Sequence, residues 1–591
     1  MVRRCAFRTA AVLAVLAATS AWAAEDVFHV IPCDALAFVA ANRIADTSAK
    51  IEKVAKQVGG KPVKLLDMLK EHTGEIKGFD DSRSAAVVLM PAKDSKEGPS
   101  RVLLVPVSDY KQFLDSWNAK PTDKIVEVTI ADEPMLIAQR GDYAAMVRKE
   151  VAGVDFRPGL EKLLDSKRSI ADQYPRMPAW LDENDVVAVA TSHGVKAASE
   201  AMQQMLQQMK DVFARMNVAE DVIENQLASL EMCVKLAQLA EKEIDTVAVG
   251  ARVDKQGNVH LSKRIRFTKN SDFAGSLAKL QPLEKGVLLG MPAGSFVLAG
   301  GGPWSDSVAR NMMTFQFDQM KKSFEKTYGL DEKQADELAK KFLEMPKGVR
   351  SFSFVMGPGQ PGEPPLSDTL ALYNVDDAPK YLDEYEKYLG AMNEPGKDSE
   401  NAKKLFTAKK TEVGGRPALE YEMALPSAPK SPGMPGMPDM AETMKKILGS
   451  EGKMKFLVVA IDEHNVAINL SGRAPIIMRA IASLKKPADG LAADAEIAKT
   501  TALLLSDAQW VGYFSPSGAV AFAKSFIDAL GEDTGFGKPN IPDFPATQPI
   551  GVAAKAKPGQ LQIEIVVPSS VLDAIGKFVE QIQGEQHPEV P

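Results

Sequence analysis

Four methionines spaced three or four residues apart are the side chains of this sequence best suited to hold a metal ion. They lie in or just after a segment rich in proline and glycine, residues 425–440, and are Met434, Met437, Met440 and Met444. Thioether sulfur is a soft ligand that suits Cu(I). The proline density prevents a regular packed element, so the segment is predicted to be an exposed loop. The pattern leaves two interpretations, a Cu(I) site or an incidental loop, and the lack of Cys and His in the cluster favours the loop.

The sequence contains no complete motif of nucleophilic or zinc catalysis. Ser192 stands beside His193 after an apolar run, but neighbours on an extended chain point to opposite faces, so a turn is the better interpretation. There is no HExxH motif. His464 follows Asp462 and Glu463 in a predicted hairpin turn, where ordinary polar turn chemistry is favoured over a surface metal site.

Phosphate binding and acid–base chemistry have equally weak signals. The stretch "GGGPW" at residues 300–304 is predicted to be a tight turn from a strand into a helix, although its amides could meet an anion. The acidic residues Asp182, Glu183 and Asp185 could serve as a paired-carboxylate site, but such clusters are usually solvated. The sequence therefore predicts no catalytic residue and no cofactor.

The N-terminus predicts export. Residues 1–23 combine three early arginines, an apolar run too short to span a bilayer, and alanines at positions 21 and 23. We expect signal cleavage after Ala23 and a periplasmic, envelope or extracellular location; the alternative is an uncleaved anchor. No later segment is long and apolar enough to span a membrane.

Charge and cysteine content exclude some classes of partner and of fold. The formal net charge of −7 becomes −10 after cleavage, because the signal carries three arginines and no acid. An acidic chain is a poor partner for nucleic acid or anionic lipid. Cys33 and Cys233 remain, and they either form a disulfide or stay two separate buried thiols. Two cysteines exclude a disulfide framework.

Five segments recur in the same order along the chain, which predicts an internal duplication. The matched pairs are 32–50 with 292–310, 102–117 with 370–385, 135–148 with 466–479, 185–198 with 509–522, and 247–267 with 550–568. A β-like run precedes each member of the second pair, at 84–90 and 351–357. The predicted halves span residues 24–275 and 285–585. Residues 199–245 have apolar side chains at helical spacing and are predicted to be a helical hairpin inserted into the first half.

Each half predicts an α+β unit of mainly antiparallel sheet with packed helices. Alternating segments about the turns at 131–134 and 462–465 indicate hairpins. The run "DALAFVAAN" at 34–42 predicts a strand buried on both faces, followed by a helix capped by Asp46 or Thr47. Asp109 and Asp377 are each predicted to cap a helix that directly follows a strand.

The opening "PCDALAFVAANRI" directly after a signal peptide, with hairpin-then-helix units repeated twice, resembles large exported bacterial proteins of an uncharacterised family, a domain of unknown function. The resemblance implies no activity. We expect an exported, non-catalytic binding or interaction protein of the bacterial envelope, with an envelope protein or an apolar small molecule as its partner. The alternatives are a periplasmic hydrolase with a site assembled from distant segments and a Cu(I)-handling protein.

Overall fold

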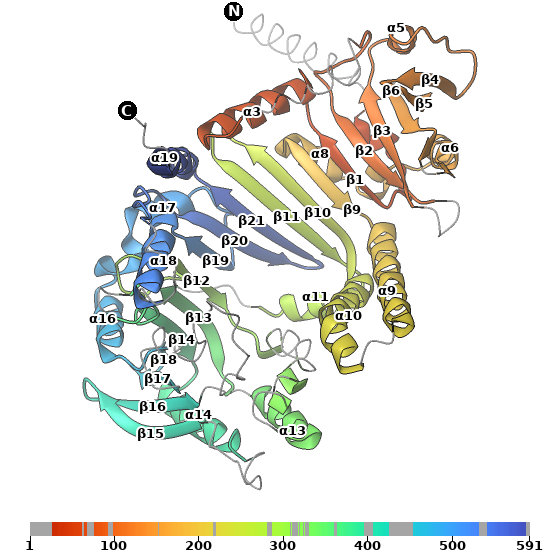
Figure 1. Cartoon of the computed structure of the whole chain (residues 1–591). Coiled ribbons are helices and arrows are strands. Elements are labelled where there is room, and N and C mark those ends of the chain that lie inside the picture. Colours follow the sequence, from red (N-terminus) through yellow and green to blue (C-terminus); the bar gives the residue numbers. More distant parts are fainter. Residues whose placement is uncertain are drawn as a thin grey trace, which may run out of the picture. The chain divides into compact units, whose positions relative to one another are not determined.

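The computed structural model describes residues 26–586 except 62–63, 65, 68–75, 93–97, 152, 217–219, 281–285, 308, 310–316, 318–319, 323, 326–329, 345, 360–362, 395–405, 425–452 and 531–539. The described residues form a mixed α+β structure with antiparallel strands, as predicted (Figure 1). Within them, no helix is both long and apolar enough to cross a membrane. The predicted signal peptide and the Met434–Met444 cluster lie outside the described residues.

The chain divides into two compact units. Unit 1 holds Met1–Ala55, Lys61–Val253 and Lys263–Thr268, and unit 2 holds Lys56–Gly60, Asp254–Ser262 and Lys269–Pro591. Helix α3 (Ile44–Gln57) and strand β11 (Val259–Phe267) have residues in both.

Unit 1 is built on an antiparallel sheet in the order β10-β9-β1-β2-β3-β6-β5-β4. Its strands are β1 (Ala37–Ala41), β2 (Ala85–Met90), β3 (Ser100–Pro106), β4 (Val126–Ile130), β5 (Glu133–Arg140), β6 (Tyr143–Arg148), β9 (Val186–Ala190) and β10 (Ile244–Val253). A separate small hairpin pairs β7 (Glu150–Val151) with β8 (Val154–Asp155). The predicted turn at Ala131 and Asp132 has positive φ at both residues, which matches the right-handed twist of a two-residue hairpin.

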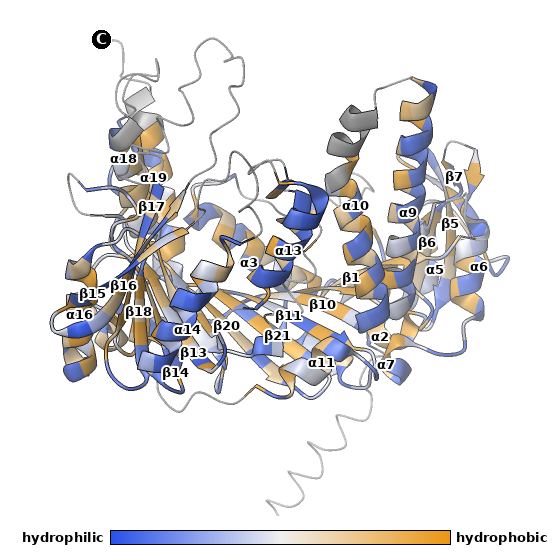
Figure 2. Ribbon diagram, turned by 90° about the horizontal axis from the view of Figure 1, so that it is seen from below, coloured by the Kyte–Doolittle hydropathy of each residue, from blue (hydrophilic) through white to orange (hydrophobic). Residues whose placement is uncertain are grey.

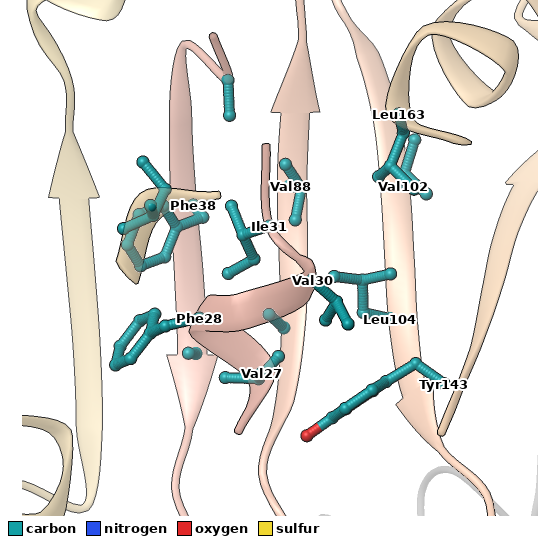
Figure 3. Packing of buried hydrophobic residues seen from close by; sticks show 14 of the residues in the cluster. Val27, Phe28, Val30, Ile31, Phe38, Val88, Val102, Leu104, Tyr143 and Leu163 are labelled. Carbon is teal, nitrogen blue, oxygen red and sulfur yellow. The ribbon is translucent and has the colours of Figure 1, made fainter. Parts of the chain in front are cut away.

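One face of this sheet carries the main core of unit 1. Phe38, Val88 and Leu104 point to that face and are at most 1 % exposed, and Phe28 packs edge-on against Phe38 (Figure 3). The covering helices include α2 (Val27–Val30), α6 (Arg157–Asp165), α7 (Ile170–Gln173) and α8 (Met177–Glu183). A second cluster lies under α5 (Tyr110–Asp115). Helices α2, α6, α7 and α8 shield one side of the sheet, whereas the cluster under α5 lies on the opposite side of β3, β6 and β5, because its Val105, Ala144 and Ile137 are the strand neighbours of Leu104, Ala145 and Leu136 in the main core.

Two long helices of unit 1 occupy the region predicted to be a helical hairpin. They are α9 (Ser192–Arg215) and α10 (Glu220–Glu243), and they pack side by side (Figures 1 and 2). Helix α9 begins seven residues before the predicted boundary at 199, because Thr191 directly after β9 accepts a hydrogen bond from the Gly194 amide and caps it. The predicted turn at Ser192–Gly194 is therefore wrong; these residues are a helix N-terminus.

The predicted cap of α3 is also wrong. The helix begins at Ile44, so Asp46 and Thr47 lie inside its first turn. Arg43 has φ of +42°, which redirects the chain into the helix earlier than the sequence indicates. Thr47 is buried and donates from its hydroxyl to the Asn42 carbonyl instead of capping.

Unit 2 is built on an antiparallel sheet in the order β21-β20-β19-β12-β13-β14-β18-β17-β16-β15. Its strands are β12 (Leu298–Pro303), β13 (Val349–Met356), β14 (Thr369–Val375), β15 (Phe406–Val413), β16 (Arg416–Ala424), β17 (Lys453–Ala460), β18 (Asn465–Asn469), β19 (Trp510–Phe514), β20 (Ile550–Lys557) and β21 (Gln560–Val567). Its described helices are α11 (Asp272–Leu277), α13 (Glu332–Phe342), α14 (Ala378–Ala391), α16 (Ala474–Lys485), α17 (Ala495–Thr501), α18 (Pro516–Leu530) and α19 (Ser569–Gln586), with short 3₁₀ turns at Pro487–Asp489 and Leu491–Ala493.

The glycines of "GGGPW" lie within strand β12, so the predicted strand-to-helix turn is wrong. A Cβ added at Gly302 would lie 2.0 Å from the Trp510 ring of the neighbouring strand, and one at Gly301 would lie 2.2 Å from the Phe352 carbonyl. The missing side chains make room for the neighbours, which is why the sequence signal for a turn misleads here.

The two units share details at corresponding points of their sheets. The eight strands of the unit 1 sheet have the same neighbours as eight strands of the unit 2 sheet. In order, β10, β9, β1, β2, β3, β6, β5 and β4 correspond to β20, β19, β12, β13, β14, β18, β17 and β16. Asp109 and Asp377 both cap a helix as predicted, since the side chain of each accepts a hydrogen bond from the backbone amide three residues later. Their backbone angles also agree, with φ of −148° and −150° and ψ of 107° in each.

One predicted match is displaced by a hairpin. The sequence pairs residues 135–148 with 466–479, which sets β5 and its following glycine against β18. In the sheets it is β6 that pairs with β3, as β18 pairs with β14. Short alternating hairpins resemble one another, so a sequence comparison slips by one strand easily.

Candidate functional site

The sheet of unit 1 has a second face that its helices leave partly open. Successive residues of a strand point to opposite faces, so Val39 and Val87 lie opposite the buried Phe38 and Val88. Val39, Val87 and Val249 are 48 %, 40 % and 42 % exposed. The prediction that the 34–42 strand is buried on both faces is therefore wrong.

The pairing registers bring these valines into one row across four strands. Val39 lies opposite Val87 on β2 and Ala188 on β9, and Ala188 lies opposite Val249 on β10. Two flanking rows are also entirely apolar. We call this surface the open face; its twelve residues are Leu89, Ala37, Ala190, Val247, Val87, Val39, Ala188, Val249, Ala85, Ala41, Val186 and Ala251. It offers a ligand no hydrogen-bonding side chain.

The corresponding strands of unit 2 carry larger side chains. Leu298, which is 38 % exposed, lies opposite Met356 and Phe514, and Phe352 stacks on Phe354 with ring centroids 6.5 Å apart. We call this surface the aromatic face; it comprises Leu298, Phe352, Phe354, Met356, Tyr373, Trp510, Phe514, Ile550 and Val552. The small residues Gly300 and Gly302 between them leave room for the rings.

A groove in unit 2 runs along α14 and continues to Trp304. Its first hollow has a volume of about 700 Å³ and its second about 580 Å³, and both are lined by Glu344, Pro346, Lys347 and Tyr381. One wall is a single face of α14, where Asp377, Tyr381, Glu384, Tyr388 and Ala391 follow at helical spacing. The opposite wall is the end of α13 and the segment after it. Helix α13 is largely hydrophilic (Figure 2).

The charges in this groove are balanced and partly paired. The first hollow is lined by four lysines and four carboxylates. Lys341 is tied to Glu394 at 2.5 Å, and Asp376 to Arg350 at 2.7 Å. Among the described residues, the structure gives Lys347 and Glu344 no ion pair, and both are exposed.

Two tyrosines belong to the lining of the groove. Tyr381 is 4 % exposed and lines both hollows, and its hydroxyl has no hydrogen-bond partner among the described residues. Tyr373 lines the second hollow. Burial raises the pKa of both phenols, because it penalises the charged phenolate. Both therefore remain neutral hydroxyl donors. Tyr385, by contrast, shares a hydrogen bond of 3.1 Å with the Tyr421 hydroxyl outside the groove lining.

A buried cluster of polar side chains around His260 is the second polar feature of unit 2. His260 lies with Nδ1 3.2 Å from Glu564 Oε1 and Nε2 3.2 Å from Asp254 Oδ2. The side chains of His260 and Glu564 are 4 % and 8 % exposed. Burial would raise the pKa of Asp254, but hydrogen bonds from Asn258 and His260 outweigh it and hold that pKa below its usual value.

This cluster contains the residue types of acid–base catalysis, but they are not arranged so that one of them could exchange a proton with a substrate. Both imidazole nitrogens of His260 are engaged by carboxylates, so neither is free to take a proton from a substrate. Asn258 extends the network, since its side-chain oxygen accepts from the Ser569 amide at the start of α19. The arrangement links the 254–258 turn to β21 and α19 and serves packing.

The residues singled out in the sequence do not meet in one site. Asp462 accepts from the His464 and Asn465 amides, which is the polar turn chemistry favoured for that segment. Asp185 is buried and accepts from Lys50 and from the Val253 amide. Asp182 and Glu183 are exposed. Among the described residues there is no group of three or more His, Cys, Asp or Glu side chains able to hold a metal.

The cysteines are free thiols in this structure, Cys33 half-buried and Cys233 exposed on α10. Both predicted alternatives, a Cys33–Cys233 disulfide and two separate buried thiols, stay predictions. No sequence pattern indicates the groove, because its lining comes from helix, loop and strand residues that are far apart in the chain and form no motif. A faint signal existed for the open face, since strands 37–41, 85–90 and 186–190 contain no polar residue.

Comparison with protein-family models, curated proteins and solved structures finds no match to this chain.

Proposed function

We propose that the protein is an exported, non-catalytic binding protein of the bacterial envelope that holds an apolar, lipid-like molecule on the open face of unit 1. One observation carries this proposal: three valines exposed by 40 % or more stand in one row across a surface of twelve apolar residues. Contiguous exposed apolar surface of this kind marks interaction sites in soluble proteins.

The chemistry of the surface selects the ligand class. Its side chains are Val, Ala and Leu only, so a ligand gains from burying hydrocarbon and not from directed hydrogen bonds. Each buried methylene contributes about 0.8 kcal/mol. An acyl chain lying across the three rows fits that pattern better than a polar metabolite does.

The predicted internal duplication belongs to the same proposal. The matched strand orders and the matching caps at Asp109 and Asp377 support it. So does a pair of glycines: a Cβ at Gly194 would lie 1.9 Å from the Leu36 carbonyl oxygen, and one at Gly518 would lie 1.8 Å from the Phe296 carbonyl oxygen. Two copies of one ancestral unit, later diverging in their open surfaces, account for these parallels.

The first test measures binding of a fluorescent fatty acid, dansyl-undecanoic acid, to the mature chain. The variant V39T/V87T/V249T keeps β-branched shape while placing hydroxyls on the central row. We expect its affinity to fall on the order of tenfold or more, because three apolar contacts lose transfer free energy. V151T/V212T is the matched control, because these valines are 41 % and 51 % exposed but lie on β7 and α9. Equal affinity in the wild type and the triple variant contradicts the proposal.

The second test is native mass spectrometry of the protein purified gently from the envelope fraction of the cells that make it. A co-purifying lipid identifies the ligand, and the same spectrum gives the mature mass, which cleavage after Ala23 fixes. A protein that retains residues 1–23 contradicts the predicted cleavage, and a protein partner in place of a lipid assigns the open face to protein contact.

A further inference from the structure

The groove of unit 2 combines three properties that the open face lacks: aromatic side chains, tyrosine hydroxyl donors and a balanced set of charges. Trp304 packs edge-on against Phe352 with ring centroids 5.8 Å apart, so the second hollow adjoins the aromatic face. Tyr373 lies opposite Phe352 in the β13–β14 pair and shares that face. The hollows are joined through Tyr381 and Pro346, which gives an elongated site and not a compact one.

We propose that this groove binds a short, uncharged glycan of three or four sugar units. Sugar hydroxyls both donate and accept, and the groove supplies acceptors at Glu344 and donors at Lys347 and Tyr381. Pyranose rings also present apolar C–H faces, which pack on aromatic side chains such as Trp304. The binding site is separate from the lipid proposal and stands without it.

The charge balance argues against the main alternative ligands. A polyanion would meet as many carboxylates as lysines in the first hollow, and two of the four lysines, Lys341 and Lys380, already have carboxylate partners. A peptide that binds by strand addition needs a free strand edge. Here one wall is helix α14, whose backbone groups are bonded within the helix, so side chains must supply the recognition.

The Tyr381 hydroxyl allows the most specific test of this binding site. Tyr381 lines both hollows and its hydroxyl has no hydrogen-bond partner among the described residues, so a ligand oxygen that accepts from it gains a hydrogen bond without breaking one within the protein. Replacing this tyrosine by phenylalanine deletes one oxygen and keeps the ring that packs under both hollows.

The experiment is isothermal titration calorimetry of the full mature chain with a panel of tri- and tetrasaccharides of glucose, galactose, mannose and N-acetylglucosamine. We expect at least one member to bind, and Y381F to weaken it about tenfold, the effect of one lost hydrogen bond. K347Q and E344Q change exposed side chains of the lining and should each weaken binding severalfold. Y385F is the matched control on the same helix and should leave affinity unchanged.

Three results overturn the proposal. The first is no heat of binding with any saccharide of the panel. The second is binding of pyrophosphate in place of the saccharides, which would assign the groove to an anion. The third is a saccharide affinity that Y381F, K347Q and E344Q all leave unchanged, which would place the glycan elsewhere on the chain.

Discussion

Units 1 and 2 use the same strand order but present different surfaces. The open face of unit 1 is made of Val, Ala and Leu, whereas the aromatic face of unit 2 sets Phe, Trp and Met around buried glycines. Unit 2 also has the groove along α14 and the buried cluster at His260. The capping residues Asp109 and Asp377 and the close-packed Gly194 and Gly518 correspond between the units, whereas the exposed side chains of the two faces differ.

The largest expected loss of stability tests whether Gly194 and Gly518 have the same structural role, which is to allow close packing against a carbonyl oxygen. Alanine at either position would place a methyl group within 2 Å of a carbonyl oxygen, Leu36 in one unit and Phe296 in the other. We expect G194A and G518A each to lower the free energy of unfolding by roughly 3 kcal/mol, the upper end of overpacking costs. Urea denaturation gives the total loss, and hydrogen exchange shows which unit opens.

G98A is the control, because no atom lies within 4 Å of a Cβ at that position and its loss should be near zero. A loss at Gly194 much larger than at Gly518 would break the comparison between the units.

The next effect belongs to the buried cluster of unit 2. The pKa of Asp254 is lowered in the folded chain, so the carboxylate stabilises the fold above its unfolded pKa, and this contribution disappears as the pH falls through the folded pKa. D254N should cost about 2 kcal/mol at neutral pH, the scale of hydrogen bonds to a charged group. The difference between wild type and variant should shrink in acid.

Hydrogen exchange of β21 peptides at pH 7 and at acidic pH measures this locally, with β9 peptides as the internal reference. A variant whose deficit is the same at both pH values would show that charge on Asp254 contributes nothing.

The smallest effect concerns the helix caps. D109A and D377A each remove a side chain that accepts from the amide three residues on, and each should cost about 1 kcal/mol. Because the two caps have the same backbone angles, their losses should agree closely. D115A, an exposed aspartate at the other end of α5, is the control and should change stability little. Thermal unfolding is sensitive enough to rank the three.

Local patterns in the sequence predicted the features that depend on neighbouring residues. The antiparallel hairpins, the Asp109 and Asp377 caps and the two-helix segment after β9 all follow from alternation, helical spacing and turn chemistry. The same reasoning failed at Gly300–Gly302, because a glycine that makes room for a neighbouring strand has the same letter as a glycine in a turn.

By itself the sequence determined that this is an α+β chain of antiparallel strands and capped helices, because those elements are set by contacts a few residues apart. Only the tertiary structure decided which apolar strand face stays open, since Val39 and Phe38 are adjacent apolar residues and helices cover just one of their two sides. The tertiary structure also brings Trp304, Lys347 and Tyr381 together in one groove. It likewise places His260 between Asp254 and Glu564. Residues so far apart in the chain meet through sheet register and helix packing, which no local pattern records.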